Sequence, residues 1–375
     1  MKKIISLVLV AVLILGLAAC AKSSPEPAKT EAPAQTQAPA SSTPAQPAQT
    51  PPAQPDKPYE YQKMNLLYAS GYNLGSPEAD ALQAFADELK ERTNGNVTMD
   101  ITWNGEGFTQ DQRIPMMLSG DVSMSAAQGC AALASYYDRL NVFAAPYVFN
   151  NKDHLMKFWN SADGQALIDD IAEHTGLRIL SFVVTGTRCV SLKDDLKITK
   201  RSDLSKYTIR MMTAEAWQVM GSALGAGGVV PLGANELYTA CQAGTVDGQD
   251  NPLPNILTYS LQEVQKSVTL TNHYVYDQPH MIAEALWQSM DPELQELIAE
   301  LAKKCADTIN AYNDEKTASA YKTITDAGMK IYELTDEEIN AYRNEVLEWY
   351  KTDPKGKAFY DTWDMDLYNL ALSYQ

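Results

Sequence analysis

The chain has 375 residues, 47 of them acidic and 30 basic, which gives a formal net charge of -17 at pH 7. This excess of negative charge disfavours nucleic acids and anionic membrane surfaces as partners. An anionic ligand would have to be attracted by particular cationic side chains against the overall field of the protein.

The first twenty residues have the pattern of a lipoprotein signal peptide. Lys2 and Lys3 precede an apolar run, residues 4–19, that is too short for a comfortable membrane span. The sequence Leu-Ala-Ala-Cys then ends at Cys20 and is typical of cleavage before a cysteine that becomes diacylated. We therefore expect a lipid anchor at Cys20, because two acyl chains hold a protein on a membrane where one does not. An ordinary signal peptide with an incidental cysteine is the alternative.

Residues 21–58 have the composition of a disordered Pro/Ala-rich tether. They are mainly Pro, Ala, Thr, Gln and Ser, which bury too little apolar surface to offset the entropy of ordering. A proline-rich chain extends by about 3 Å per residue, so the tether would reach on the order of 100 Å. No later apolar run has spanning length. The sequence predicts an exported, extracytoplasmic protein that is tethered to the membrane, at the cell surface or in a periplasm.

From residue 59 onward, strand patterns and helix patterns alternate. A strand over 65–69 is followed by Ser76-Pro77, an N-cap with proline at the first helical position. Similar alternation continues through the chain, which is long enough for two domains. The further predicted strands are 97–103, 177–185, 207–212 and 229–232, and the further predicted helices are 214–227, 234–244 and those beginning at 291–292 and 335–338. This order predicts α/β domains with helix-covered sheets.

No catalytic, cofactor or metal motif stands out. The patterns GxSxG, HExxH, GxxxxGK[ST] and an EF-hand loop are all absent, and the glycines at 225–228 follow a helix where a dinucleotide fingerprint would open one. Four cysteines follow Cys20 without zinc-ligand spacing, and we interpret them as buried free thiols in preference to disulfides. They are Cys130, Cys189, Cys241 and Cys305. We expect neither an enzyme nor a bound cofactor or metal.

Two arginines lie at predicted strands. Arg188 comes just after the strand that begins at 177, and Arg210 lies between two apolar residues of the strand 207–212. Burying an arginine costs free energy unless its charge is paired. An outward-facing position or a structural ion pair would explain either residue. Alternatively, the guanidinium points into a cleft, where its planar fork binds a carboxylate through two hydrogen bonds.

Residues 244–252, GTVDGQDNP, present a similar choice. Asp and Asn favour turns because their side chains hydrogen-bond to nearby backbone, so turn chemistry alone would explain this composition. A turn that holds Asn251 at a cleft would have the same composition.

Taken together, these segments resemble the substrate-binding P subunit of TRAP (tripartite ATP-independent periplasmic) transporters, the DctP family. The resemblance runs from about residue 64 to the C-terminal helices, and residues 236–252 are its most specific part. The similar segments occur in the family's order and spacing: ERTNGNVTMDI (91–101), APYVFNN (145–151), GTR (186–188), YTIRMM (207–212), ANELYTACQAGTVDGQDNP (234–252) and VQKSVTLTNHYVYDQ (264–278).

The resemblance implies a role for each residue that matches the family's ligand site. Arg210 would form a bidentate salt bridge with a ligand carboxylate, and Arg188 and Asn251 would contact the ligand from the same side. Thr208 replaces a frequent lysine. Asp250 replaces the usual glutamate and is expected to alter a supporting contact.

Further pocket-lining candidates are Gln128, Thr213 and Trp217. Members of the family that bind sialic acid have Asn, Glu and an aromatic residue near positions where this chain has Gly71, Gly129 and Ala234. These departures argue against sialate as the ligand.

The fold implied by the resemblance is a two-domain, periplasmic-binding-protein-like α/β fold of the TRAP type, with an interdomain ligand cleft, connecting strands and a long helix. Domain I would comprise 62–185 plus 277–315, and domain II would comprise 186–276 plus 316–375. Closure of the two domains around a ligand is a general mode for such proteins.

The function implied is capture of a small organic-acid anion, such as a C4-dicarboxylate, a keto acid or a sugar acid. The protein would deliver it to a TRAP membrane permease, with uptake driven by an ion gradient. The alternatives are a binding protein for an ABC importer and a ligand sensor that docks on a membrane receptor. A secreted enzyme is disfavoured by the missing motifs.

Overall fold

The computed structural model describes residues 59–375. The predicted signal peptide (1–20), the lipidation site Cys20 and the tether (21–58) lie outside this range. Within residues 59–375, no helix combines the length and the apolar character needed to cross a membrane.

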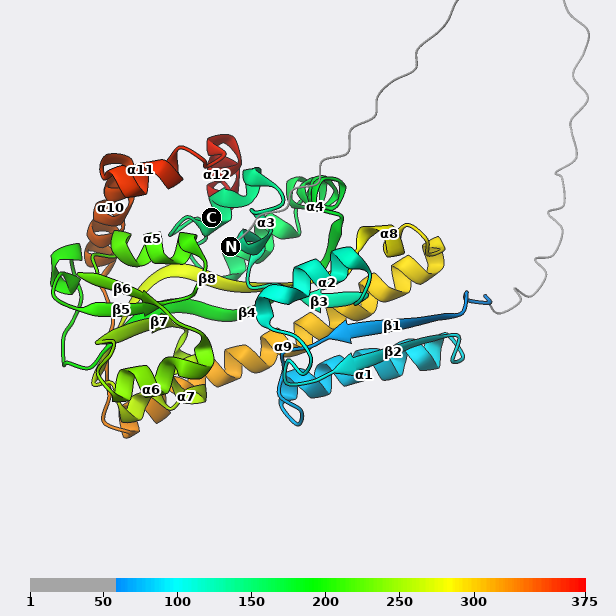
Figure 1. Ribbon diagram of the computed structural model, residues 1–375, viewed down its shortest axis with the longest axis horizontal. Coiled ribbons are helices and arrows are strands. Elements are labelled where there is room, and N and C mark those ends of the chain that lie inside the picture. Colours follow the sequence, from blue (N-terminus) through cyan, green and yellow to red (C-terminus); the bar gives the residue numbers. More distant parts are fainter. Residues whose placement is uncertain (1–58) are drawn as a thin grey trace, which may run out of the picture. The chain divides into compact units, whose positions relative to one another are not determined.

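The described part of the chain is built on one mixed sheet with helices on both faces (Figure 1). The strand order is β2-β1-β3-β8-β4-β7-β5-β6, and β9 pairs with β8. The strands are β1 (Met64–Ala69), β2 (Val97–Thr102), β3 (Met124–Ala126), β4 (Leu177–Leu192), β5 (Thr208–Met211), β6 (Gly228–Pro231), β7 (Gly248–Asn251), β8 (Ser267–Ala283) and β9 (Lys330–Tyr332).

Two long antiparallel strands, β4 and β8, run through both halves of the sheet. At one end β8 pairs with β3, next to the parallel pair β1 and β2, while at the other end β4 pairs with β7, next to β5 and β6. The register of β4 against β8 shifts between Val184 and Gly186. A register shift of this kind bends a strand locally. The two halves are therefore joined by continuous strands that carry an irregularity near their middle.

Helices cover both faces of the sheet. They are α1 (Pro77–Arg92), α2 (Arg113–Ser119), α3 (Lys152–Trp159), α4 (Ala162–Thr175), α5 (Glu215–Ala223), α6 (Leu237–Gln242), α7 (Leu253–Thr258), α8 (Glu284–Trp287), α9 (Pro292–Asp326), α10 (Asp336–Thr352), α11 (Pro354–Tyr360) and α12 (Met365–Leu372). In Figure 1, α3, α4, α5 and α10 to α12 lie on one face, and α1, α6, α7 and α9 lie on the other.

The apolar core forms three clusters. The largest packs α3, α4, α5 and α10 against one face of the sheet. On the other face, the first half of α9 packs with α1, and its second half packs with α6 and α7. Helix α9, 35 residues long, thus contributes to a separate core in each half of the molecule. Each cluster contains at least one cysteine, and the four cysteines of residues 59–375 are buried and free, as expected.

Two asparagines of α9 bind the irregular segment of β4. The side chain of Asn310 accepts a hydrogen bond of 2.7 Å from the amide of Val184 and donates one of 3.0 Å to the carbonyl of Phe182. Asn313 donates a bond of 3.1 Å to the carbonyl of Val184. Buried backbone groups that lose their strand partners at an irregularity need other partners. The helix supplies them here.

Most predicted elements are confirmed. Ser76 caps α1 by accepting a hydrogen bond from the amide of Ala79, and Thr335 and Glu338 form the capping box of α10. The helix predicted over 214–227 is shorter than expected and ends at Ala223, because Gly225 follows with a φ of 104° and passes close to the backbone of Arg201.

The turn predicted over 244–252 is only partly correct. The chain turns before residue 248, but residues 248–251 form β7, which pairs with β4 on one side and with β5 on the other. The polar composition that suggested a turn instead serves side-chain contacts in a buried strand. The prediction is wrong for residues 248–251, because the side chains that favour turns also make buried polar networks.

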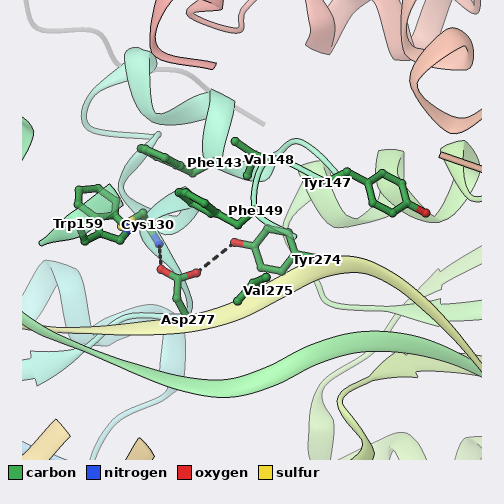
Figure 2. A pocket seen from close by; sticks show the side chains of 9 residues that line it. All are labelled: Cys130, Phe143, Tyr147, Val148, Phe149, Trp159, Tyr274, Val275 and Asp277. Atoms are coloured by element: carbon green, nitrogen blue, oxygen red, sulfur yellow. Dashed lines mark hydrogen bonds between the residues drawn. The ribbon is translucent and has the colours of Figure 1, made fainter. Parts of the chain in front are cut away.

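A buried carboxyl, Asp277, lies on β8 opposite Val184 (Figure 2). It accepts hydrogen bonds from the Cys130 amide at 3.1 Å and the Tyr274 hydroxyl at 3.4 Å. It faces a cavity of about 10 Å³ that is lined mainly by aromatic and aliphatic side chains. Burial raises the pKa of Asp277 to about 6, and the hydrogen bonds only partly oppose this rise.

We expect Asp277→Asn to gain stability relative to the wild type as the pH rises from 4 to 7.5. The folded-state pKa is raised, so the protonated form stabilises the fold below the unfolded pKa, and that contribution is lost as the pH rises through about 6. The pKa difference corresponds to roughly 3 kcal/mol. Urea unfolding of both proteins across this pH range measures the difference in the free energy of unfolding, and a difference independent of pH would contradict the prediction.

Candidate functional site

A cleft of about 750 Å³ lies between the two halves of the sheet. Its lining residues follow the carboxyl ends of the parallel strands: Ser70 to Tyr72 after β1, Gln128 after β3, Met212 and Thr213 after β5, and Leu232 to Glu236 after β6. The middle of β4 and β8 and one side of α9 complete the wall. Clefts at the carboxyl ends of strands are the usual ligand sites of α/β proteins, and this volume suits a small molecule.

The cleft brings together most of the residues that the sequence indicated. Gln128, Arg188, Arg210, Thr213 and Asn251 all line it. Trp217 is not among the lining residues. It is buried behind the cleft on α5, with its ring 4.7 Å from that of Tyr274 and 5.5 Å from the guanidinium carbon of Arg188.

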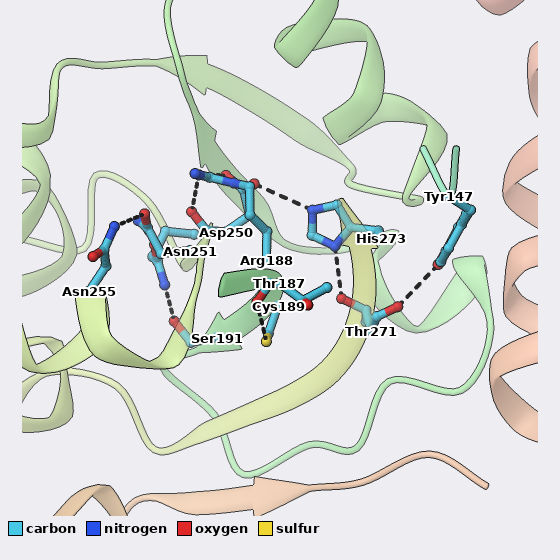
Figure 3. Close-up of polar contacts among 11 residues, drawn as sticks. Tyr147, Thr187, Arg188, Cys189, Ser191, Asp250, Asn251, Asn255, Thr271 and His273 are labelled. Carbon is cyan, nitrogen blue, oxygen red and sulfur yellow. Dashed lines mark hydrogen bonds and ion pairs between the residues drawn. The ribbon is translucent and has the colours of Figure 1, made fainter. Parts of the chain in front are cut away.

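Arg188 is a buried ion-pair residue (Figure 3). Its Nε donates to Oδ2 of Asp250 at 2.6 Å, and its Nη2 donates to Oδ1 at 3.0 Å and to the Asp250 carbonyl at 2.6 Å. The guanidinium lies over the ring of Tyr276, 5.0 Å from its centroid. Burial opposes the charge of Arg188, but the carboxylate of Asp250 outweighs it and raises the arginine pKa. The same pairing holds the pKa of Asp250 well below its usual range in spite of burial.

Further residues extend this network away from the cleft. His273 approaches Oδ2 of Asp250 with its Nε2 at 3.4 Å, while its Nδ1 lies 2.9 Å from the Thr271 hydroxyl. Tyr147 donates to the carbonyl of Thr271 at 3.3 Å. Burial lowers the pKa of His273, against the attraction of Asp250. A neutral histidine therefore completes a network in which the only close ion pair is Arg188 with Asp250.

Asn251 is held by its neighbours in β7 and α7. Its amide nitrogen donates to the side-chain oxygen of Gln249, and its side-chain oxygen accepts a bond of 3.2 Å from Asn255. Gln249 in turn donates to the Ser191 hydroxyl at 2.7 Å. These contacts fix the orientation of the Asn251 amide at the surface of the cleft, where it is only 4% exposed.

Arg210 has no carboxylate partner within residues 59–375. Its Nε and Nη2 both donate to the carbonyl of Leu232, at 2.8 and 2.5 Å, and the side chain is 97% buried. The Nη1 of Arg210 makes no hydrogen bond with any group of residues 59–375. Burial lowers the pKa of Arg210, although an arginine this basic stays charged. Arg210 is therefore a partly desolvated cation at the cleft that forms no ion pair with any carboxylate of residues 59–375.

A third arginine, Arg113, lines the cleft and is not among the residues that the sequence predicts for the site. It begins α2, and its Nη1 donates to the carbonyl of Ala126 at 3.3 Å. In the described chain, its buried Nε has no hydrogen-bond partner. Arg113 follows a polar loop in the sequence, with no strand or helix periodicity to distinguish it from a surface arginine. Only the fold places it at the cleft.

No group of three or more His, Cys, Asp or Glu side chains in residues 59–375 is arranged to hold a metal ion. The cleft presents arginines, a lysine, amides and hydroxyls, which are donors suited to an oxyanion, together with the carboxylates of Glu78, Asp111 and Glu236.

The chain is similar to several known bacterial solute-binding proteins. Over 235 residues the chain is 26% identical to the sialic acid-binding periplasmic protein SiaP of Vibrio cholerae, covering 63% of this chain and 72% of that protein. It is also 26% identical to the C4-dicarboxylate-binding periplasmic protein DctP of Rhodobacter capsulatus over 275 residues, 72% of this chain and 80% of the other.

A solved TRAP periplasmic solute-binding protein from Roseobacter denitrificans, with bound 3-deoxy-D-manno-oct-2-ulosonic acid, superimposes with a TM-score of 0.74 at 28% identity. The match covers 84% of this chain and 100% of that one, which confirms the expected α/β fold. The model of the family described as bacterial extracellular solute-binding protein, family 7, matches residues 69–355. The chain therefore belongs to this family of substrate-binding transport proteins, whose members are not enzymes.

Proposed function

We propose that this protein is the extracytoplasmic solute-binding lipoprotein of a TRAP transporter and that it captures a small organic-acid anion. The observation that carries the proposal is Arg210, a buried cation that lines the cleft without a carboxylate partner in residues 59–375. A ligand carboxylate would supply the missing counter-charge and accept two hydrogen bonds from the guanidinium.

The similar proteins support an acidic ligand. Their names specify sialic acid, a C4-dicarboxylate and an octulosonic acid, each of which carries a carboxylate. Sialate is the least suitable of these for the present cleft. By the family resemblance, sialate-binding members have polar side chains near the positions of Gly71 and Gly129, and this chain has none there. A side chain at Gly71 would displace the Arg113 guanidinium, and one at Gly129 would meet Tyr274 and Asp277.

Each candidate residue has a role that fits its surroundings. Arg210 binds the carboxylate, and Asn251 donates its remaining amide hydrogen. Arg188 adds positive potential but, being paired, acts mainly by fixing β7. Gln128 and Thr213 make polar contacts from the two sides of the cleft. Trp217 acts indirectly, because it packs behind Arg188 and does not line the cleft.

The proposed transport cycle uses the two domains given above, 62–185 plus 277–315 and 186–276 plus 316–375. Gln128 belongs to domain I, and Arg210 and Asn251 belong to domain II, so a ligand that contacts both domains stabilises a closed state by its differential affinity. The register shift next to Gly186 and its contacts with α9 suit a hinge. The closed protein would deliver its ligand to the permease while Cys20 keeps it near the membrane.

We expect Arg210→Gln to lose carboxylate binding while remaining folded. Truncating one partner of a buried charge pair costs about 2–5 kcal/mol, so affinity should fall at least thirtyfold or so. A thermal-shift and calorimetry panel of succinate, D-glucuronate, pyruvate and 3-deoxy-D-manno-oct-2-ulosonic acid measures the loss, because a ligand that binds only the native state raises Tm.

The matched control is Arg92→Gln. Arg92 pairs with Glu300 on the surface and does not line the cleft, so this change removes the same charge without touching the site. An Arg210→Gln protein that binds its acid as tightly as the Arg92→Gln protein would refute the assignment of the carboxylate site.

We expect Asp250→Asn to destabilise the fold at neutral pH by about 3–5 kcal/mol, because it leaves Arg188 buried without its counter-charge. The pKa of Asp250 is lowered in the folded state, so the stabilisation is present above pH 4 and is lost as the pH falls below it. The difference from the wild type in denaturant unfolding should therefore shrink toward pH 3.

Asp195→Asn serves as the comparison for this variant. Asp195 pairs with Lys330 on the surface, where ion pairs contribute at most about 1 kcal/mol. Equal effects of the two substitutions at pH 7 would show that the buried pair does not stabilise the strand that holds Asn251.

A further inference from the structure

The side chains of β7 point alternately to the two faces of the sheet, because successive residues of a strand face opposite sides. Asp250 lies on one face and pairs with Arg188. Gln249 and Asn251 lie on the other face, where the register of β4 against β7 sets Ser191 opposite Gln249. The ion pair therefore leaves the orientation of the Asn251 amide to a second set of contacts.

Four hydrogen bonds on this second face join five side chains, and the series starts at the cleft. Asn255 on α7 donates to the Asn251 oxygen at 3.2 Å, and the Asn251 nitrogen donates to the side-chain oxygen of Gln249. Gln249 donates to the Ser191 hydroxyl at 2.7 Å, and Ser191 donates to the side-chain oxygen of Gln265 at 3.3 Å. Figure 3 shows Asn255, Asn251 and Ser191 of this series, which we call the amide relay. Every bond of the amide relay runs in the same direction, from the cleft to Gln265.

The members of the amide relay beyond the cleft are enclosed in the core. Ser191 and Gln249 are 0% exposed, and Gln265 is 3% exposed. Burial of polar groups costs free energy unless they are hydrogen-bonded. A buried polar network whose members are paired holds them in one arrangement. The amide relay is therefore suited to fixing the orientation of the side chain at its cleft end.

The direction of the amide relay decides which atom of the Asn251 amide faces which neighbour. Turning this amide over would set its oxygen against the Gln249 oxygen and its nitrogen against the Asn255 nitrogen, so both hydrogen bonds would be lost. The cross-strand neighbour Cys189 is a poor substitute, because a thiol is a weak hydrogen-bonding group and this one donates to the carbonyl of Thr187. Asn251 can therefore turn over only if its neighbours in the amide relay turn with it.

Ser191 ties these amides to the core. Its hydroxyl accepts from the Gln249 nitrogen and donates to the Gln265 oxygen, a combination that neither atom of a side-chain amide provides. Gln249 can turn over only if this hydroxyl reverses and the buried Gln265 turns as well. Ser191 thus connects an amide at the cleft to a side chain that has little freedom to move.

Resting on the function proposed above, we propose that Ser191 and Gln249 are positioning residues for solute binding that act through Asn251. With the amide relay intact, the Asn251 nitrogen keeps one hydrogen on Gln249, and its second hydrogen is the donor that it offers to the solute. An N–H group attracts an oxyanion, whereas a carbonyl oxygen in its place repels one. Two side chains that never reach the solute thereby set the preference of this part of the cleft for a hydrogen-bond acceptor.

NMR on the free protein tests the hold on Asn251 without any solute. The side-chain NH₂ signals of Asn251 are identified in an amide-nitrogen correlation spectrum by their absence in Asn251→Ala. They should shift in Ser191→Ala, because Gln249 then loses the acceptor of its N–H and no longer holds the Asn251 amide in one orientation.

Ser267→Ala is the matched control for this variant. Ser267 lies on β8, is 1% exposed and does not line the cleft. Its hydroxyl also both donates and accepts, to the carbonyl of Asp194 at 2.7 Å and from the amide of Leu196 at 3.2 Å. Removing it should leave the Asn251 signals and solute binding unchanged.

Calorimetry tests whether the hold on Asn251 matters for binding, with whichever of succinate, D-glucuronate, pyruvate and 3-deoxy-D-manno-oct-2-ulosonic acid binds the wild type most tightly. Ser191→Ala and Gln249→Met should each lower the affinity about two- to tenfold, the range expected for one net hydrogen bond. In an Asn251→Ala background the same changes should alter the affinity by less than about twofold, because the residue through which they act is gone. A side chain that served only the fold would cost the same in both backgrounds.

Three outcomes would overturn the proposal. The Asn251 signals could stay in place in Ser191→Ala, the loss of affinity could be no larger than that in Ser267→Ala, or the losses could be equal in the wild-type and Asn251→Ala backgrounds. In each of these cases binding that still depends on Arg210 leaves the proposed function intact. Failure of all four acids to bind the wild type would contradict both proposals.

Discussion

The ion pair between Arg188 and Asp250 is the contact on which the geometry of the cleft depends. It links β4, which runs through both halves of the sheet, to β7, which carries Asn251. Both side chains are almost fully buried, so neither can be lost without leaving an uncompensated charge. Because Asp250 neutralises Arg188, the cleft-lining cations of residues 59–375 that form no ion pair are Arg113, Arg210 and Lys316. One internal pair thereby decides which arginines support the fold and which are available to a solute.

The electrostatics of the cleft contrast with those of the whole chain. The protein carries a formal charge of -17, yet Arg113, Arg188, Arg210 and Lys316 all line one concave surface. A low-dielectric wall strengthens local charge interactions relative to distant ones, which salt screens beyond about 8–10 Å. An acidic surface is therefore compatible with an anion site, provided that the cations are concentrated and partly desolvated. This arrangement also disfavours adventitious anions elsewhere on the molecule.

Local patterns in the sequence were sufficient for the α/β class, for the caps of α1 and α10, and for Arg188, Arg210 and Asn251 as residues of interest. Local patterns do not predict features that depend on tertiary contacts. The sequence predicts a turn where β7 lies, because Gln249, Asp250 and Asn251 are polar, and only tertiary pairing makes a polar strand stable in a core. The charge of Arg188 is compensated by Asp250, which lies 62 residues away in the sequence. The position of Arg113 depends on the space left by Gly71, and no local sequence pattern links these two residues.

The distribution of the four buried cysteines has a practical consequence. Cys130 lies in the core under α3 and α4, Cys305 in the core between α1 and α9, and Cys189 and Cys241 in the core beneath α6 and α7. Burial raises the thiol pKa of Cys189 to about 12, of Cys241 to about 11 and of Cys305 to about 12, and that of Cys130 well above its usual range. Thiols in this state react slowly with oxidants and electrophiles, so the folded protein keeps them reduced in an oxidising environment. Each apolar cluster therefore contains at least one cysteine that becomes reactive only when that cluster unfolds. The order in which the thiols react with an alkylating reagent reports which part of the molecule unfolds first.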